Sequence, residues 1–447
     1  MLVLLGILLL KKYMIAMNDL CLLWKKILRI MNKVVNKVIN KVSKMSYTLF
    51  FIGLLPFIMV MGNSLFIPQV PFIQQSFQLT TVESGWFLTS FSVPAAFFVL
   101  IGGVVSDRFG RKRICAIGLL LIIGGCILST IALFHVSTSW NVLIAGRIIQ
   151  GIGAGIVSPL AMAFIAELYR GKERLKAFGT IEVYNGVGKL ISPIIGGFIL
   201  LLTWNISFIL YLAISLLALA GLFISIRKES ITNSSLSLKK VVHSQKQLWR
   251  EHWRWLLPIT YGGGVGMFLL FGYLFFLSYV SEQASPFPSE WNGAVIACPL
   301  IGLTVCSYVT GRFLKNSTDM YKQMMIYGVM LMIAGTLGLF ARESFSLIVL
   351  AMFFFAAGLG IFLPAANAAL AAIVSNETRG TVFASYSMIR FLGVALGPVM
   401  FGIWMTNVEQ LIFNAFFFIS GLALFMMMSW RCFPLGHDCD HEKMSHI

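Results

Sequence analysis

Residues 102–113 read Gly-Gly-Val-Val-Ser-Asp-Arg-Phe-Gly-Arg-Lys-Arg, and they connect two long apolar segments. Asp107 lies where the first of these segments ends, beside four cations. Glycines allow helices to pack closely, and Gly110 permits a tight turn. We interpret Asp107, Arg108 and Arg111 as a latch that holds one side of a membrane protein closed until a proton or a substrate changes the charge balance. A basic loop that only sets the topology of the chain is the alternative.

The composition is that of a membrane protein. The chain has 447 residues, of which 58% are hydrophobic and 11% are charged, whereas about a quarter of the residues of a soluble domain are charged. Apolar runs of about 20 residues, long enough to cross a bilayer, recur along the chain without the alternation of barrel strands. We therefore predict an all-α membrane protein with twelve transmembrane helices. They are expected at residues 47–74, 84–105, 115–134, 140–165, 177–201, 205–226, 255–280, 291–312, 323–341, 345–370, 381–405 and 410–430.

The net charge of +17 is explained by the loops between these helices. Lys and Arg residues gather in alternate loops, and the opposite set of loops holds a single basic residue, Arg342. The positive-inside rule therefore places both termini in the cytoplasm. We expect a multi-pass protein of the bacterial plasma membrane that contacts lipids and does not bind nucleic acid.

An internal repeat divides the chain into two halves of six helices. At an offset of 205 residues, Gly153 matches Gly358 and Pro193 matches Pro398, and six further positions keep this register. Parallel repeats of this kind place a cavity between two pseudo-symmetric bundles. We predict a basic N-terminal segment at 1–46, one bundle at 47–226, a cytoplasmic linker at 227–254, a second bundle at 255–430 and a cytoplasmic tail at 431–447.

The N-terminal segment allows two interpretations. Its lysines at a spacing of four residues favour an amphipathic helix on the cytoplasmic leaflet. Translation that starts instead at Met31 or Met45 is the alternative.

The latch run also resembles a motif of the major facilitator superfamily, Gly-x-x-x-Asp-Arg-x-Gly-Arg-Lys, which lies between helices two and three. The match is at Gly103, Asp107, Arg108, Gly110, Arg111 and Lys112. The resemblance covers residues 47–430 and implies twelve helices in two bundles that transport by alternating access. After the eighth helix the same motif recurs only in part, with Gly311 at the position where the acid is expected. Only the first half therefore has a complete latch.

The fourth helix contains Arg147 in an apolar span, where a charge is costly and must face protein or a wet cavity. The run from Arg147 to Gly155 resembles the helix-four motif of the superfamily, whose arginine is implicated in proton transfer in several exporters. An arginine with a purely structural role, bonded to backbone carbonyl groups, is the alternative.

The fifth helix carries small and charged residues on one face, because steps of three, four and seven residues return to that face. The part from Gly186 to Gly197 resembles a motif of drug:proton antiporters, with Ser192 in place of the usual glycine. This stripe is expected to seal the interface between the bundles, and generic close packing is the alternative. Its members are Gly179, Glu182, Gly186, Lys189, Pro193, Gly196 and Gly197.

The charges of this face point to the transported species. A buried Glu182 is expected to carry a proton or to bind a cationic substrate; an ion pair with Lys189 or Arg390 is the alternative. Asn185 matches Arg390 in the repeat, so the second half contributes its own charge to the cavity. Lys189 and Arg390 together leave an anionic substrate open.

These observations predict a proton-coupled transporter that exports small amphipathic compounds or drugs, with Arg147 and Glu182 handling the proton. The alternatives are a transporter of an anionic metabolite, siderophore or lipid-linked compound, and a membrane sensor or scaffold that does not transport. Motifs of ATP binding and of common hydrolases are absent from the sequence, so we expect neither an enzyme nor a cofactor. The spacing of Cys432, His437 and Cys439 in the tail matches no established metal site, and we expect a monomer without bound metal.

Overall fold

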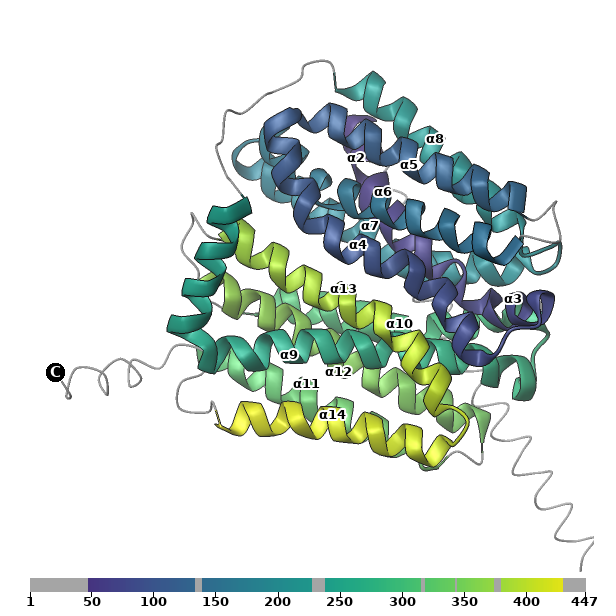
Figure 1. Cartoon of the computed structure of the whole chain (residues 1–447). Helices are drawn as coiled ribbons and strands as arrows, with labels where there is room; N and C mark the ends of the chain where they lie inside the picture. Colours follow the sequence, from purple (N-terminus) through teal and green to yellow (C-terminus); the bar gives the residue numbers. More distant parts are fainter. Residues whose placement is uncertain are drawn as a thin grey trace, which may run out of the picture. The chain divides into compact units, whose positions relative to one another are not determined.

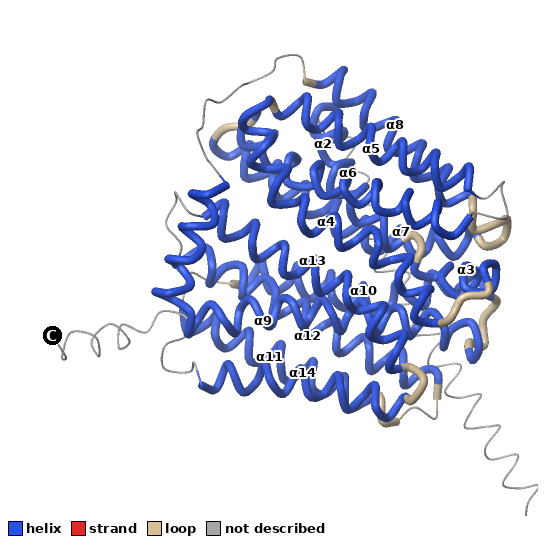
Figure 2. The backbone as a smooth tube through the Cα atoms, in the orientation of Figure 1, coloured by secondary structure: helices blue, strands red, loops and turns tan. Residues whose placement is uncertain are grey.

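The computed structural model describes residues 47–132, 139–226, 238–314, 318–341, 344–373 and 379–428. Within these ranges the chain is helical and contains no strand (Figure 2). The predicted all-α fold is therefore confirmed. The predictions for residues 1–46, for Arg342 and for the tail 431–447 lie outside the described residues.

The first half of the chain supplies helices that match the predicted spans within a few residues. They are α2 (Tyr47–Ser64), η1 (Ile67–Gln69), α3 (Val70–Phe77), α4 (Thr81–Phe109), α5 (Arg111–Ala132), α6 (Ser139–Leu168), α7 (Gly171–Ile199) and α8 (Ile206–Ser225). The second half supplies α9 (Leu238–Ala284), η2 (Ser289–Trp291), α10 (Asn292–Phe313), α11 (Thr318–Gly338), α12 (Phe345–Ile373), α13 (Arg379–Trp404) and α14 (Val408–Met428).

Ten helical stretches in the described ranges are long and apolar enough to cross a membrane by themselves. The two predicted spans outside this set are α7 and α11. Charged residues explain both exceptions, since α7 holds Glu182 and Lys189, and α11 begins with Asp319 and Lys322. A helix whose charges face protein or a wet cavity is tolerated in a bilayer.

The helices form two sets that meet along two lines. In the first half α5 packs on α6 and α8, and α4 packs on α6; in the second half α9 packs on α13, and α12 packs on α10 and α11 (Figure 1). The sets meet where α4 lies along α13 and where α7 lies along α10. Residues 51–447 form one compact unit. The predicted domain boundaries stay a prediction.

The predicted linker differs from the structure in its second part. Helix α9 begins at Leu238 and runs through the polar stretch into the seventh span. No Gly or Pro interrupts residues 238–257, so nothing ends the helix before the membrane segment. Arg250, Trp253 and Arg254 are exposed on this extension. Polarity predicted where the apolar span begins, but it did not predict where the helix begins.

The first span is interrupted in a way that positions α7. Helix α2 ends at Ser64, and a short 3-10 turn with Pro68 leads into α3. The interruption buries Gln69, whose Nε2 donates to the carbonyl oxygen of Gly196 at 2.8 Å and to Oγ of Ser207 at 2.6 Å. The first span is thereby joined to α7 and α8.

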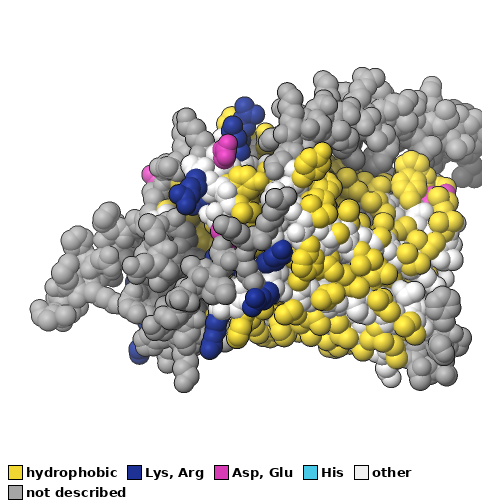
Figure 3. All heavy atoms as spheres, turned by 90° about the horizontal axis from the view of Figure 1, so that it is seen from above, with side chains coloured by type: hydrophobic (Ala, Val, Ile, Leu, Met, Phe, Trp, Pro, Cys, Tyr) yellow, Lys and Arg dark blue, Asp and Glu magenta, His cyan; other side chains and the backbone are white. Residues whose placement is uncertain are grey.

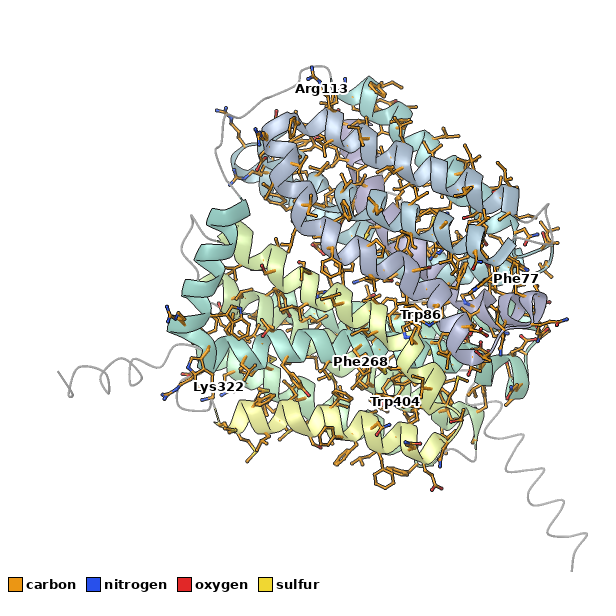
Figure 4. All side chains as sticks on the ribbon, viewed as in Figure 1. Phe77, Trp86, Arg113, Phe268, Lys322 and Trp404 are labelled. Atoms are coloured by element: carbon orange, nitrogen blue, oxygen red, sulfur yellow. The ribbon has the colours of Figure 1, made fainter. Side chains whose placement is uncertain are left out.

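The two ends of the helices differ in charge. We call "basic end" the side of the helices that holds residues 107–113, 167–176, 250–254 and 312. We call "far end" the side that holds residues 77–81, 199–206, 284–292 and 404–408. Arg113 and Lys322 lie toward the basic end, whereas Phe77 lies at the far end (Figure 4). On the face seen in Figure 3, Lys and Arg side chains gather beside a broad hydrophobic surface. An apolar surface of this size fits contact with lipid.

Candidate functional site

The latch residues meet at the basic end around one arginine. The Asp107 carboxylate accepts from Nε and Nη2 of Arg111, at 3.1 and 2.9 Å. Nη1 of the same guanidinium donates to the Ala163 carbonyl oxygen at 3.0 Å and to Oε2 of Glu167 at 3.2 Å. Arg111 therefore ties the end of α4 to the end of α6, and all of these partners belong to the first bundle.

The remaining residues of the latch motif have separate positions. The ammonium of Lys112 donates to the carbonyl oxygen of Ile226, just beyond the end of α8. Arg108 is exposed, with its guanidinium 5.4 Å from the ring centre of Phe109. Gly110 ends α4 with a φ of 96°, a conformation that disfavours other residues, so the predicted tight turn is confirmed.

Arg147 is fully buried and held by neutral acceptors. Its guanidinium donates to the backbone oxygens of Gly62 at 2.7 Å and Phe87 at 3.3 Å, and to the side-chain oxygens of Gln150 at 2.9 Å and Asn63 at 3.4 Å. Three phenylalanine rings lie around it, each with its centre 4.7 Å from the guanidinium carbon. These bonds join α2, α4 and α6, and among the described residues no carboxylate pairs with Arg147. This geometry is that of the structural alternative.

At the far end α4 and α13 are in direct contact. Oγ1 of Thr81 donates to the carbonyl oxygen of Gly402 at 2.9 Å, and Oγ1 of Thr89 donates to that of Ala395. A Cβ atom on Gly85 would lie 2.9 Å from the carbonyl oxygen of Pro398. Only a residue without a side chain allows the two helices to approach this closely.

The predicted stripe of α7 closes the second contact, against α10. A Cβ atom on Gly197 would lie 2.6 Å from the carbonyl oxygen of Glu290, and one on Gly293 would clash with the carbonyl oxygen of Pro193. Toward the middle of α7, a Cβ atom on Gly186 would lie 3.2 Å from the methyl group of Thr304. Gly196, buried like Ser192, packs instead against the backbone of Leu65. Of the predicted stripe, Gly186, Pro193 and Gly197 therefore lie at the interface between the bundles.

The same interface is open toward the basic end. A Cβ atom on Gly103, Gly179 or Gly311 would meet no other described segment within 4 Å. Glu182 lies in this part of α7, and its side chain is exposed. The prediction that Glu182 is buried is therefore wrong for this conformation, because α7 and α10 separate below Gly186. The described residues contain no ion pair between Glu182 and either Lys189 or Arg390.

The two central cations do come close to each other. Lys189 on α7 has Arg390 of α13 and Glu182 as its charged neighbours. Arg390 lies with its guanidinium carbon 5.5 Å from the ring centre of Tyr386, one turn earlier on α13. That both halves contribute charge to the cavity stays a prediction.

Two groups of site residues are not predicted from the sequence. Glu167 stands just before a basic loop, but its pairing with Arg111 spans 56 residues, and no local pattern indicates it. Thr304 packs on α7 at Gly186 and Tyr386 lies beside Arg390, but both resemble ordinary polar residues of membrane helices.

Comparisons with known proteins identify the family. A model described as Major Facilitator Superfamily matches residues 52–317 and 291–438. The chain belongs to the major facilitator superfamily. Members of this superfamily are carriers of small molecules rather than enzymes, and they typically act as monomers.

Relatives of this major facilitator protein include one named as an exporter and others named for drug resistance. The "Bacillibactin exporter" of Bacillus subtilis (strain 168) is 31% identical over 375 residues, which cover 83% of this chain and 93% of the relative. "Quinolone resistance protein NorA" of Staphylococcus aureus (strain COL) is 24% identical over an alignment that covers 77% of this chain and 87% of the relative. A solved structure of a "D-xylose-proton symporter" superposes with a TM-score of 0.70 at 16% identity, covering 88% of this chain and 98% of that one. The chain is therefore a membrane-spanning transporter with the major facilitator fold.

Proposed function

We propose that this transporter exports a small amphipathic compound, of the drug or siderophore type, in exchange for protons. The positive-inside rule makes the basic end cytoplasmic. In the conformation described above, the central site then opens to the cytoplasm and is closed toward the outside by the contacts of the far end. A relative named as an exporter and relatives named for drug resistance support the outward direction.

The observation that carries the proton coupling is the position of Glu182. It is an exposed acid on the interface face of α7, between the open basic end and the closed far end. In an alternating-access cycle this carboxyl group faces each side of the membrane in turn. It would release a proton to the cytoplasm and take one up when the outer side is open. Intramembrane acids that exchange protons in this way are typical of proton relays.

Arg147 has a positioning role in this proposal. Its four neutral acceptors fix α2, α4 and α6 to one another. The first bundle therefore moves as a rigid body, while the latch of Asp107, Arg111 and Glu167 stabilises its cytoplasmic end.

Everted membrane vesicles with an acid interior and a pH-sensitive dye test the coupling. Two probes are added separately, tetraphenylphosphonium as a cation and naphthalene-1-carboxylate as an anion. Glu182→Gln removes the proposed carrier, and Glu173→Gln removes an exposed acid at the beginning of the same helix as a matched control. Proton movement on addition of a probe, retained in Glu173→Gln and lost in Glu182→Gln, is the expected result. Equal proton movement in Glu182→Gln would contradict the assignment.

A second candidate is transport of an anion without proton exchange. The juxtaposition of Lys189 and Arg390 favours it. Movement of naphthalene-1-carboxylate with no response of the pH dye in any variant is its expected result.

A further inference from the structure

Two positive charges from opposite bundles meet at the centre of the interface. Lys189 comes from the middle of α7 and Arg390 from the middle of α13. Glu182 lies seven residues from Lys189, about 10 Å along the helix axis. Within the described residues Glu182 forms no ion pair with either cation. The centre of the interface therefore has an excess of positive charge.

Among the described residues, the two cations differ from Arg147 in their hydrogen-bond and ion-pair partners. Within the described residues neither Lys189 nor Arg390 has an ion pair, and Nε of Arg390 is buried without a hydrogen-bond partner. Arg147, by comparison, donates to four oxygens. A charge in a membrane span without a partner is costly, and two like charges side by side are more so. Such groups mark a binding site for a ligand of opposite charge.

Hydroxyl groups without partners surround the pair. Oγ of Ser192, one turn from Lys189, and Oγ1 of Thr304 are buried and have no hydrogen-bond partner among the described residues. Thr304 approaches α7 at Gly186, one turn on the other side of Lys189. The hydroxyl of Tyr386, whose ring lies beside Arg390, is likewise buried and unpaired. Unpaired hydroxyl groups on α7, α10 and α13 thus lie near one or the other cation.

We propose that Lys189 and Arg390 bind the anionic group of the transported compound, a carboxylate, phenolate or sulfonate on an apolar or aromatic body. Ser192 and Thr304 donate further hydrogen bonds to the same group. This inference rests on the proposed export function and names its substrate class, a small organic anion. The bound anion would also affect the movement of the bundles. Because the two cations repel each other across the interface, an anion bound between them reduces this repulsion and allows the bundles to approach each other around the substrate.

Equilibrium dialysis with the full-length protein in lipid nanodiscs tests the proposal. The probes are naphthalene-1-carboxylate and naphthalene-1-methylammonium, which share a ring system and differ in charge. Each charge-assisted hydrogen bond contributes about 10- to 100-fold in affinity. We expect wild type to bind the anion at least about tenfold more tightly than the cation, and Lys189→Gln and Arg390→Gln each to lose about 10- to 100-fold for the anion.

Conservative and control variants separate charge from folding. Lys189→Arg and Arg390→Lys keep the positive charge and are expected to keep the preference for the anion, whereas Lys189→Glu reverses it. Arg312→Gln removes an exposed arginine at the basic end of α10 and leaves binding unchanged. Tighter binding of the cation by wild type, no binding of the anion, or unchanged binding in both Gln variants would overturn the proposal. Anion binding that depends on Lys189 and Arg390, in a protein that moves no protons in vesicles, would retain this inference and reject the proton coupling.

Discussion

The two ends of the interface between the bundles use the same residue type, yet they are in opposite states. Three helices carry a pair of glycines 18 residues apart, one near each end; these pairs are Gly85 and Gly103 on α4, Gly197 and Gly179 on α7, and Gly293 and Gly311 on α10. Eighteen residues are about five turns of an α-helix, so both members of a pair point in the same direction. The far-end member lies against the other bundle in each pair, whereas the basic-end member meets no described segment.

This difference indicates that the basic end is built for a contact that this conformation does not make. The contacts of Gly197 with Gly293 and of Gly186 with Thr304 fix an antiparallel register between α7 and α10. Continued along both helices, this register places Gly179 opposite Gly311. The two closures of an alternating-access cycle thus fall on one helix face, at opposite ends.

The largest effect is expected from a side chain in the far-end contact. Gly293→Val places its Cβ against the carbonyl oxygen of Pro193, and overpacking costs about 1–3 kcal/mol. Transport in vesicles should fall about 5- to 150-fold, and the thermal stability of the purified protein should drop. Gly311→Val, on the same face of the same helix, should leave that stability unchanged. Equal stability of the two variants would contradict a closed far end.

A smaller effect is expected at the latch of the basic end. Asp107→Asn removes a partly exposed ion pair from Arg111, worth about 0.2–1 kcal/mol. We expect transport to fall by up to about fivefold, with normal amounts of protein in the membrane. Arg108→Gln changes a neighbouring charge that is exposed, so its transport should stay within about twofold. Unchanged transport in Asp107→Asn would show that Asp107 does not take part in gating.

Thr89→Val should weaken the far end more gently. It deletes one hydrogen bond between α4 and α13, worth about 0.5–1.5 kcal/mol. The measurement uses a cysteine introduced at position 182 of a protein without its native cysteines, labelled from the cytoplasmic side. In the Thr89→Val variant this cysteine should react about threefold more slowly, because the far end opens more often. Thr130→Val is the control, because Thr130 bonds only within α5. Identical labelling in both variants would show that Thr89 does not hold the closed state.

The smallest effect is expected at Gly103. Gly103→Ala meets no described segment, and alanine favours a helix over glycine by about 1 kcal/mol. The purified protein should therefore be as stable as wild type or slightly more stable, whereas Gly85→Ala, on the same face of α4, should be less stable. Chemical denaturation or thermal unfolding measures both. A larger loss of stability in Gly103→Ala would mean that the basic end of α4 is already packed.

The sequence predicts the parts of this account that depend on local chemistry. Apolar runs predict the spans, and the pattern of small residues predicts α7 although its charges lower its mean hydropathy. The tight turn at Gly110 follows from residue type, and the central meeting of Lys189 and Arg390 follows from the repeat.

Other features depend on how distant segments pack. The pairing of Arg111 with Glu167 and the neutral acceptors around Arg147 join helices far apart in the sequence, so no periodicity indicates them. The exposure of Glu182 depends on which end of the interface is closed. The same sequence is compatible with closure at the basic end and with closure at the far end. It therefore does not predict which end is closed in a given structure.

Cross-linking of a cysteine pair at positions 179 and 311 tests the central claim most directly. The pair 186 and 304, which is in contact in this conformation, serves as the reference, and the seven native cysteines are first replaced by serine. Disulfide formation requires Cα atoms within about 7 Å. The account predicts that 179/311 links only while vesicles transport substrate, and that the link then stops transport. Linking of 179/311 at rest as readily as 186/304, or no linking during transport, would contradict the alternation of the two ends.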